Sequence, residues 1–314
     1  MKKFLGFSII AVLMSSGLFA QTFIVPKRFV WPQIPADTAK RPGSYPWICG
    51  DTFRVNCDHI IDETLIPFDP SQVQPADTIF VNLNYIDFFL YTIHPLIASP
   101  YILVTHNSIH RAPGLFEQFI DDPKIIAWFA KNTSINHPKL HPLPLGFMNR
   151  HWPAGDTPTL EAARFKVGTY KKDKLLYINF DLKTNKERVD IVKLFDDKSF
   201  VHKAERKPFA EYLQDLAESK FVLSPEGTSI DCHRTWESIL VGSIPVVVHS
   251  TIDSVFEGLP VLIVDSFEQI TEEFLNEKYA EMAGKSYKMN RMFADYWRNK
   301  IFALQEEYRN ASNK

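Results

Sequence analysis

Short apolar runs alternate along the chain with stretches of helical periodicity. In the first half, such runs predict strands at 46–50, 77–82, 101–105, 124–129 and 139–145. In the second half, they predict strands at 174–180, 221–224, 244–248 and 260–264. Strands separated by helical stretches of this length indicate parallel βαβ units. The pattern therefore predicts an α/β fold.

The helical stretches differ in how clearly they are marked. Residues 208–219 place Phe209, Leu213 and Leu216 on one face, as an amphipathic helix requires. Helices are also expected at 185–195 and 234–241, the second ending at Gly242, and from Phe267, capped by Asp265 or Ser266.

Turn-forming residues at 153–158 mark the best candidate for a boundary between two such α/β units. We therefore expect an N-terminal lobe at 21–160, a C-terminal lobe at 161–285 and a C-terminal helical segment at 286–314. Ligands of open α/β sheets bind beyond the C-terminal ends of the strands. A cleft between two facing Rossmann-like lobes is the expected site.

Residues 1–20 have the layout of a targeting segment. Two lysines precede an apolar run at 4–14, and Ala20 stands before the expected cleavage point. Either a cleaved signal peptide or a retained signal anchor fits this layout. We expect an exported or secretory-pathway protein, periplasmic or secreted, or lumenal if anchored. Membrane contact is expected only if the segment is retained.

Composition narrows the range of partners. The chain carries 35 basic and 37 acidic residues, a net charge of −2, which argues against nucleic acid as a partner. Three cysteines match no zinc motif. Cys49 and Cys57 could form a disulfide, with Cys232 left over, but buried free thiols are favoured.

Residues 224–237 carry the clearest chemical pattern. A buried strand is expected to end at Ser224, and a loop of small and polar residues leads to a helix that begins near His233. Amides at a helix N-terminus attract anions, and Gly227 permits close approach of a ligand. Arg234 could bind a phosphate, and Glu237 lies three residues further on the same helix face. The alternative is an ordinary strand–loop–helix with Arg234 and Glu237 as a surface ion pair.

The amino-acid sequence of this segment and the residues around it resembles the C-terminal signature of exostosin-type glycosyltransferases (GT47-type, GT-B superfold). The matching positions are Lys220-Phe221, Pro225 and Gly227, Arg234 and Glu237, and Gly242 with Ile244-Pro245-Val246. The α1,3-fucosyltransferases have a similar arrangement. However, the Asn-Ser of their loop is absent here, and Ser238 stands where they have lysine.

The resemblance implies a GT-B enzyme that moves a sugar from a nucleoside-diphosphate sugar, with a UDP-sugar favoured, to a glycan or other hydroxyl acceptor. It implies that Glu237 holds the donor ribose and that Arg234 or nearby amides hold the diphosphate. Further donor contacts are expected from Ser224, Glu226, Gly227, Thr228 and Asn179, with Lys183 or Arg188 near the phosphates. The alternatives are a fucosyltransferase-like enzyme using a GDP-sugar, an epimerase, or a non-catalytic carbohydrate-binding protein.

Transfer also needs a stabilised leaving group and a base for the acceptor. Arg234 serves the first need, and Asp51 and His106, beyond two N-terminal strands, are the candidates for the second. Alternatively, Asp51 caps a helix and His106 satisfies a backbone carbonyl. No Asp-x-Asp motif ends a strand, so we expect metal-independent chemistry without a cofactor. His137, His141 and His151 flank prolines near the boundary and are assigned structural or hinge roles.

Overall fold

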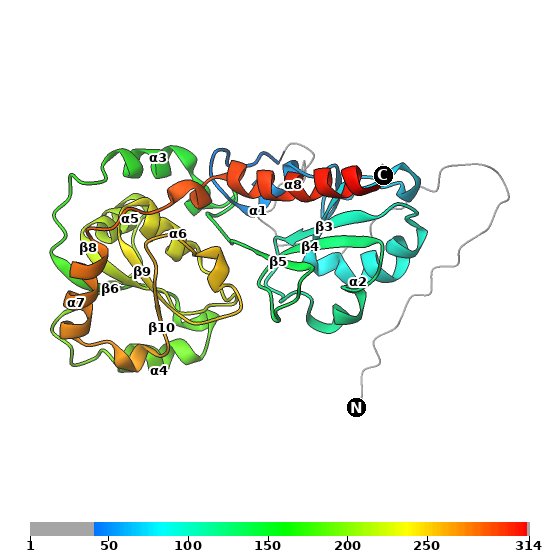
Figure 1. Cartoon of the computed structure of the whole chain (residues 1–314). Helices are drawn as coiled ribbons and strands as arrows, with labels where there is room; N and C mark the ends of the chain where they lie inside the picture. The colour runs from blue at the N-terminus through cyan, green and yellow to red at the C-terminus, as the bar shows by residue number, and fades with distance from the viewer. Residues whose placement is uncertain (1–40, 313–314) are drawn as a thin grey trace, which may run out of the picture.

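A five-stranded parallel sheet forms the centre of each of two lobes that lie side by side (Figure 1). The computed structural model describes residues 41–312. The expected targeting segment at 1–20 therefore lies outside the described residues. The two sheets confirm the predicted α/β fold with two Rossmann-like lobes.

The N-terminal sheet follows the order of the chain. Its strands are β1 (His59–Ile61), β2 (Thr78–Asn82), β3 (Tyr101–His106), β4 (Ile125–Lys131) and β5 (Leu140–Leu143), in that spatial order. Because the winding never reverses, the helical connections cover a single face. These are η2 (Pro70–Gln72), η3 (Leu83–Tyr85), α2 (Ile86–Phe88), η4 (Phe89–Ile93), η5 (His94–Leu96) and η6 (Gly114–Phe119). Alternate strand residues such as Val81 and Leu103 pack on that side, whereas Phe80 and Val104 face the other.

The prediction of a strand at 46–50 is wrong. Trp47 makes only an isolated antiparallel bridge to Phe293, and the helix α1 (Gly50–Val55) begins at once. Cys49 is the N-cap, and its sulfur accepts a hydrogen bond from the Thr52 amide. The run is apolar because Trp47, Ile48 and Cys49 are all buried beneath the rest of the lobe.

The C-terminal sheet reverses its winding. Its spatial order is β10–β9–β8–β6–β7, formed by β6 (Lys174–Ile178), β7 (Val201–Lys203), β8 (Ser219–Leu223), β9 (Ile244–Val248) and β10 (Leu262–Val264). β6 pairs with β7 on one side and with β8 on the other. This is a topological switch point, where open α/β sheets place their ligands.

The helices of this lobe are α4 (Glu187–Lys193), α5 (Phe209–Ala217), α6 (His233–Leu240) and α7 (Glu272–Met282), with the turns η8 (Leu182–Thr184), η9 (Asp253–Val255) and η10 (Phe267–Gln269). α5 buries Leu213 and Leu216, as its periodicity predicts. α6 ends before Gly242, whose φ of +76° stops a helix at little cost. The helix expected from Phe267 is only the turn η10 with Ser266 as its cap, and α7 begins later behind Thr271.

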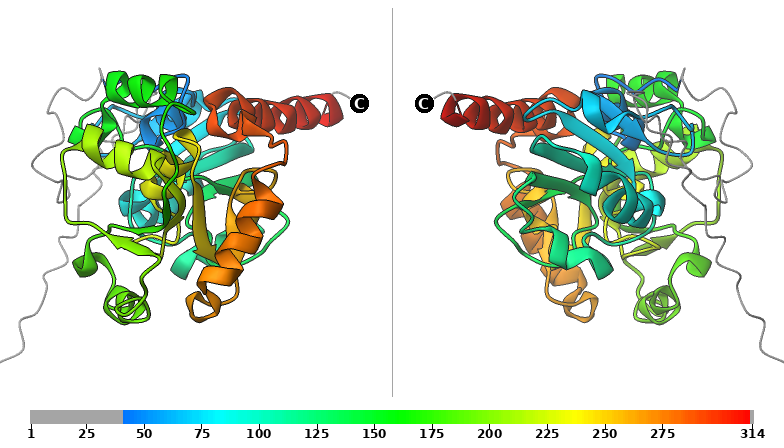
Figure 2. Two further views of the ribbon diagram at one scale, coloured as in Figure 1. Left: turned by 90° about the vertical axis from the view of Figure 1, so that its left-hand side faces the viewer. Right: turned by 90° about the vertical axis from the view of Figure 1, so that its right-hand side faces the viewer.

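Two segments tie the lobes together. After η7 (Pro153–Gly155), α3 (Thr157–Phe165) begins behind its N-cap Asp156 and packs on α5 and α6, so the boundary expected after residue 160 falls inside a helix. After η11 (Met289–Met292), α8 (Ala294–Ser312) returns to the N-terminal lobe and lies along α1 (Figures 1 and 2). There it covers the sheet face that the connections leave open.

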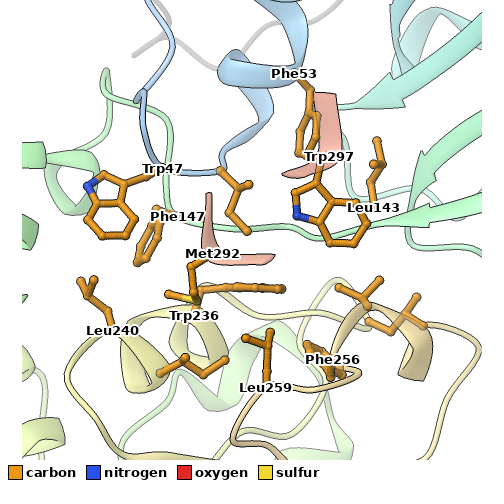
Figure 3. Close-up of a cluster of buried hydrophobic side chains, with 14 of the residues drawn as sticks. Trp47, Phe53, Leu143, Phe147, Trp236, Leu240, Phe256, Leu259, Met292 and Trp297 are labelled. Carbon is orange, nitrogen blue, oxygen red and sulfur yellow. The ribbon is translucent and has the colours of Figure 1, made fainter. Parts of the chain in front are cut away.

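One apolar cluster bridges the two lobes. Trp47, Phe147 and Trp297 of the N-terminal side meet Trp236 and Phe256 of the C-terminal side (Figure 3). All are at most 5% exposed. Large aromatic side chains bury 150–250 Å² each and contribute strongly to such contacts. The cluster therefore fixes how the lobes face one another.

Cys49, Cys57 and Cys232 are free thiols, so the disulfide alternative is not realised. Within residues 41–312, no helix combines the length and apolar character that crossing a membrane requires.

Candidate functional site

A cleft of about 1900 Å³ lies between the lobes. The N-terminal wall comes from the segments after β2, β3 and β5, and the C-terminal wall from 179–184, 204–207, 227–229 and 231–234, which follow β6, β7 and β8. Both walls thus lie at the C-terminal ends of strands, and the second is at the switch point between β6 and β8.

Arg234 is fixed in the first turn of α6 with part of its guanidinium unused. Its Nε donates to the carbonyl of Asn179 at 2.9 Å, and its Cζ lies 5.2 Å from the centre of the Phe180 ring. Nη1 is buried without a hydrogen-bond partner in the described part of the chain. A buried, unpaired donor costs about 1–3 kcal/mol. An anionic ligand at this position would remove that cost.

Arg188 shapes the neighbouring loop. Its Nε and Nη2 each donate at 2.8 Å to the carbonyls of Glu226 and Pro225, and its Nη1 donates to Asp181 O at 3.0 Å. A Cβ on Gly227 would lie 3.0 Å from Nη2 of this arginine. Because its donors are used on main-chain carbonyls, Arg188 holds the loop rather than a ligand.

Glu237 faces the cleft from the next turn of α6. Glu237 is 4% exposed, and its carboxylate accepts a hydrogen bond from the Tyr212 hydroxyl at 3.0 Å. Burial raises the pKa of this carboxyl to about 7, although Tyr212 and Arg234 act in the opposite direction. Within residues 41–312, Arg234 and Glu237 do not form the surface ion pair of the alternative interpretation.

The other expected donor contacts divide into two groups. Gly227, Thr228 and Asn179 line the cleft. Ser224 and Glu226 do not, and this part of the prediction needs correction. Both line a second cavity of about 440 Å³ on the other side of the loop. The Ser224 hydroxyl is hydrogen-bonded to that of Thr235 at 2.9 Å, and the Glu226 carboxylate accepts from Arg111 at 3.1 Å.

Neither expected base can take a proton from a ligand in the cleft. His106 is 2% exposed, its Nε2 donates to Pro144 O at 3.0 Å, and its Nδ1 accepts the Asn107 amide at 2.8 Å. Burial lowers its pKa to about 3. His106 therefore satisfies a backbone carbonyl, as the alternative interpretation states. Asp51 is 0% exposed and lies in the first turn of α1 behind the cleft wall.

Sequence reasoning missed several polar groups of the walls. Lys131 ends β4, donates to Ser108 O, and reaches across to Ser229 Oγ at 2.8 Å. Burial lowers the pKa of Lys131 to about 8. His233 donates from Nδ1 to Gly146 O at 2.7 Å, and burial lowers its pKa to about 4. The contacts of Lys131 with Ser229 and of His233 with Gly146 join residues 98 and 87 positions apart, so no local spacing could reveal them.

Residues 167–300 match the family model described as the RXYLT1 C-terminal domain. The matched range begins just before β6 and includes Arg234 and Glu237. The C-terminal lobe is exostosin-like. The match thus confirms the resemblance that the sequence signature predicts, and it indicates that this lobe is glycosyltransferase-like.

Among residues 41–312, no cluster of three or more His, Cys, Asp or Glu side chains could hold a metal ion.

Several solved structures are similar to the chain at low identity. The GtfA/B complex has a TM-score of 0.35 at 10% identity, over 76% of this chain and 55% of that one. The pneumococcal O-GlcNAc transferase GtfA, in complex with UDP and GlcNAc, has 0.32 at 12%, over 75% and 54%. The UDP-GlcNAc 2-epimerase from Methanocaldococcus jannaschii has 0.31 at 12%, over 68% and 72%. The chain spans about half the length of the first two. No curated protein matches it in sequence.

Proposed function

We propose that the protein transfers a sugar from a nucleoside-diphosphate sugar, most suitably a UDP-sugar, to a hydroxyl group of a glycan or similar acceptor. The observation that carries this proposal is the placement of Arg234 and Glu237. They are one turn apart on α6, both line the cleft, and they lie at the switch point of a lobe with glycosyltransferase character.

Arg234 supplies the positive charge for the diphosphate. Its Nε is held by Asn179 O and its guanidinium by the Phe180 ring, so the remaining N–H groups are pre-oriented. A guanidinium can give two parallel hydrogen bonds to phosphate oxygens. The N-terminus of α6 adds its partial positive charge. Together they stabilise the diphosphate as it leaves.

Glu237 binds the ribose of the donor. One oxygen accepts from Tyr212, and the carboxylate retains lone pairs for the ribose hydroxyls. Burial strengthens such hydrogen bonds because water does not compete for them. Gly227 and Thr228 line the cleft beside this pair, where a small residue lets the loop approach the nucleotide.

We further propose that transfer needs no divalent ion or cofactor, since Arg234 and the helix terminus provide charge for the leaving group. The acceptor binds against the N-terminal wall. We place the reaction in an exported or secretory compartment, because of the expected targeting segment at 1–20.

Thermal unfolding and calorimetric titration of the chain from residue 21 with UDP, GDP and CDP test the proposal. We expect one nucleotide, UDP, to bind and raise the melting temperature. Arg234→Ala should weaken binding roughly tenfold or more, because a hydrogen bond to a charged group contributes about 1.5–3 kcal/mol. The matched control is Arg309→Ala, which removes an exposed arginine of α8. Preferential binding of GDP would favour the GDP-sugar alternative, and no response to any of the three would refute nucleotide-sugar transfer.

A further inference from the structure

A buried carboxylate lies directly behind a histidine of the N-terminal cleft wall. Asp51 is in the first turn of α1, and His151 is in the segment after β5 that leads to η7. Asp51 Oδ2 and His151 Nδ1 are 3.5 Å apart. Within residues 41–312, neither of these two buried atoms has a hydrogen-bond partner, and each is the other's nearby polar neighbour. His151 itself lines the cleft.

Asp51 is held so that one oxygen remains for His151. Its Oδ1 accepts from Arg41 Nε at 2.9 Å, from Arg41 Nη2 at 2.6 Å and from Asn107 Nδ2 at 2.9 Å. Its amide donates to Asn149 Oδ1 at 2.9 Å. With Oδ1 occupied by three donors and the backbone held, the orientation of the carboxylate is fixed. Oδ2 therefore points at the imidazole.

Electrostatics keep this carboxylate ionised. Burial alone would raise the pKa of Asp51, but His151 and Arg41 hold it below its ordinary value. An ionised Asp51 attracts a proton to Nδ1 of the neighbouring imidazole. The tautomer of a histidine is set by the hydrogen bond that one ring nitrogen makes. With its proton on Nδ1, neutral His151 keeps the lone pair of Nε2 for a ligand.

We propose that His151 is the general base of the transfer and that Asp51 is its positioning residue. The inference rests on the proposed function. The acceptor O–H bond breaks as its oxygen forms a bond to the anomeric carbon of the sugar, and the proton passes to His151 Nε2. The bond from the anomeric carbon to the diphosphate oxygen breaks, and its electron pair leaves with the diphosphate beside Arg234. The proton on His151 then returns to water.

Other acid–base groups of the cleft are less suited to this step. Both nitrogens of His106 are engaged. His233 donates from Nδ1 to a main-chain carbonyl and adjoins Arg234, on the side of the leaving group. The Glu63 carboxylate accepts from Arg41 on one oxygen and from Asn82 Nδ2, at 2.7 Å, on the other. His110 lines the cleft but is exposed, and no ion pair to a carboxylate is found for it among the described residues.

The first test measures the tautomer and requires no substrate. Long-range ¹H–¹⁵N spectra of the histidine-labelled protein, recorded in mildly alkaline buffer, identify which nitrogen of each neutral imidazole carries the proton. The His151 signal is assigned by its loss in His151→Gln. We expect the Nδ1–H form in the wild type and a shift toward Nε2–H in Asp51→Asn. If Asp51→Asn does not fold, the wild-type tautomer still decides, because an Nε2–H form of His151 would overturn the proposal.

The second test measures release of UDP from UDP-xylose, UDP-N-acetylglucosamine, UDP-galactose and UDP-glucuronate, with water or simple glycosides as acceptors. His151→Gln should lower release roughly 100-fold or more, the usual contribution of a general base, with UDP affinity unchanged. The matched control His249→Gln, which changes an exposed histidine outside the cleft, should keep the wild-type rate. A His151→Gln protein that retains the wild-type rate would overturn the assignment of the base. A wild type that binds no nucleotide would instead refute the proposed function, and the tautomer would still decide whether Asp51 positions His151.

Discussion

The substitution Glu237→Gln should make the protein more stable at alkaline pH and less able to bind its donor. Burial raises the pKa of Glu237 from 4.5 to about 7. The folded state therefore binds this proton more tightly than the unfolded state. As the pH rises from the unfolded toward the folded pKa, the unfolded state loses its proton first, and the wild type loses stability.

The size of this effect follows from the two pKa values. Each pH unit between 4.5 and about 7 corresponds to about 1.4 kcal/mol, so the ionised carboxylate costs about 3 kcal/mol in the ligand-free protein. Glutamine keeps the shape and can still accept from the Tyr212 hydroxyl, but it carries no charge. The difference in free energy of unfolding between variant and wild type should rise from near zero at about pH 4.5 to about 3 kcal/mol near pH 8.

Urea unfolding of both proteins at the two pH values is the assay, supported by thermal melts. For a chain of this size, the gain near pH 8 corresponds to a melting temperature roughly 6 °C or more above that of the wild type. Calorimetry should show that Glu237→Gln weakens UDP binding, because the ionised carboxylate is the better acceptor for ribose hydroxyls. A stability difference that is the same at both pH values, or unchanged UDP affinity, would contradict these two roles of the buried Glu237 carboxylate.

Three further predictions concern the packing of the two lobes and the chemistry. Gly50→Ala should lower the free energy of unfolding by about 1–3 kcal/mol in urea titrations, because a Cβ there would lie 1.7 Å from Asn107 Oδ1; a neutral result would contradict the packing described. Trp236→Phe should cost a similar amount, about 1–3 kcal/mol, since its indole N–H donates at 2.7 Å to the buried Asp231 carboxylate, and a stability equal to that of the wild type would speak against this contact. Sugar transfer should persist in the presence of a chelator such as EDTA; abolition by EDTA with recovery on adding Mg²⁺ or Mn²⁺ would show that the leaving group depends on a metal ion.

The sequence predicts most strands because buried parallel strands are continuous apolar runs. It fails at 46–50, since a buried helix entry with its cap produces the same run of apolar letters as a strand. It also misses β1 and β7, which have three residues each and lie at sheet edges. Edge strands of this length, with exposed polar residues such as His202 and Lys203, leave no apolar run to detect.

Some residues of the candidate site can also be predicted from the sequence, whereas others cannot. Arg234 and Glu237 are predictable because their relation is local, one turn of one helix. The role that we propose for Asp51 cannot be predicted from local spacing, because it depends on His151, a hundred residues further along the chain. Sequence spacing places Asp51 near the cleft but cannot show that His151 lines the cleft in front of it. Ser224 and Glu226 fail for a related reason, because the two sides of a loop face different cavities.

We expect the cleft side of α6 to bind the nucleoside diphosphate of a sugar donor. A crystal structure of the protein with UDP tests it most directly. Ribose hydroxyls should lie within hydrogen-bonding distance of the Glu237 carboxylate, and phosphate oxygens should contact the Arg234 guanidinium. UDP bound instead in the second cavity beside Ser224, or bound with neither of these contacts, would contradict it.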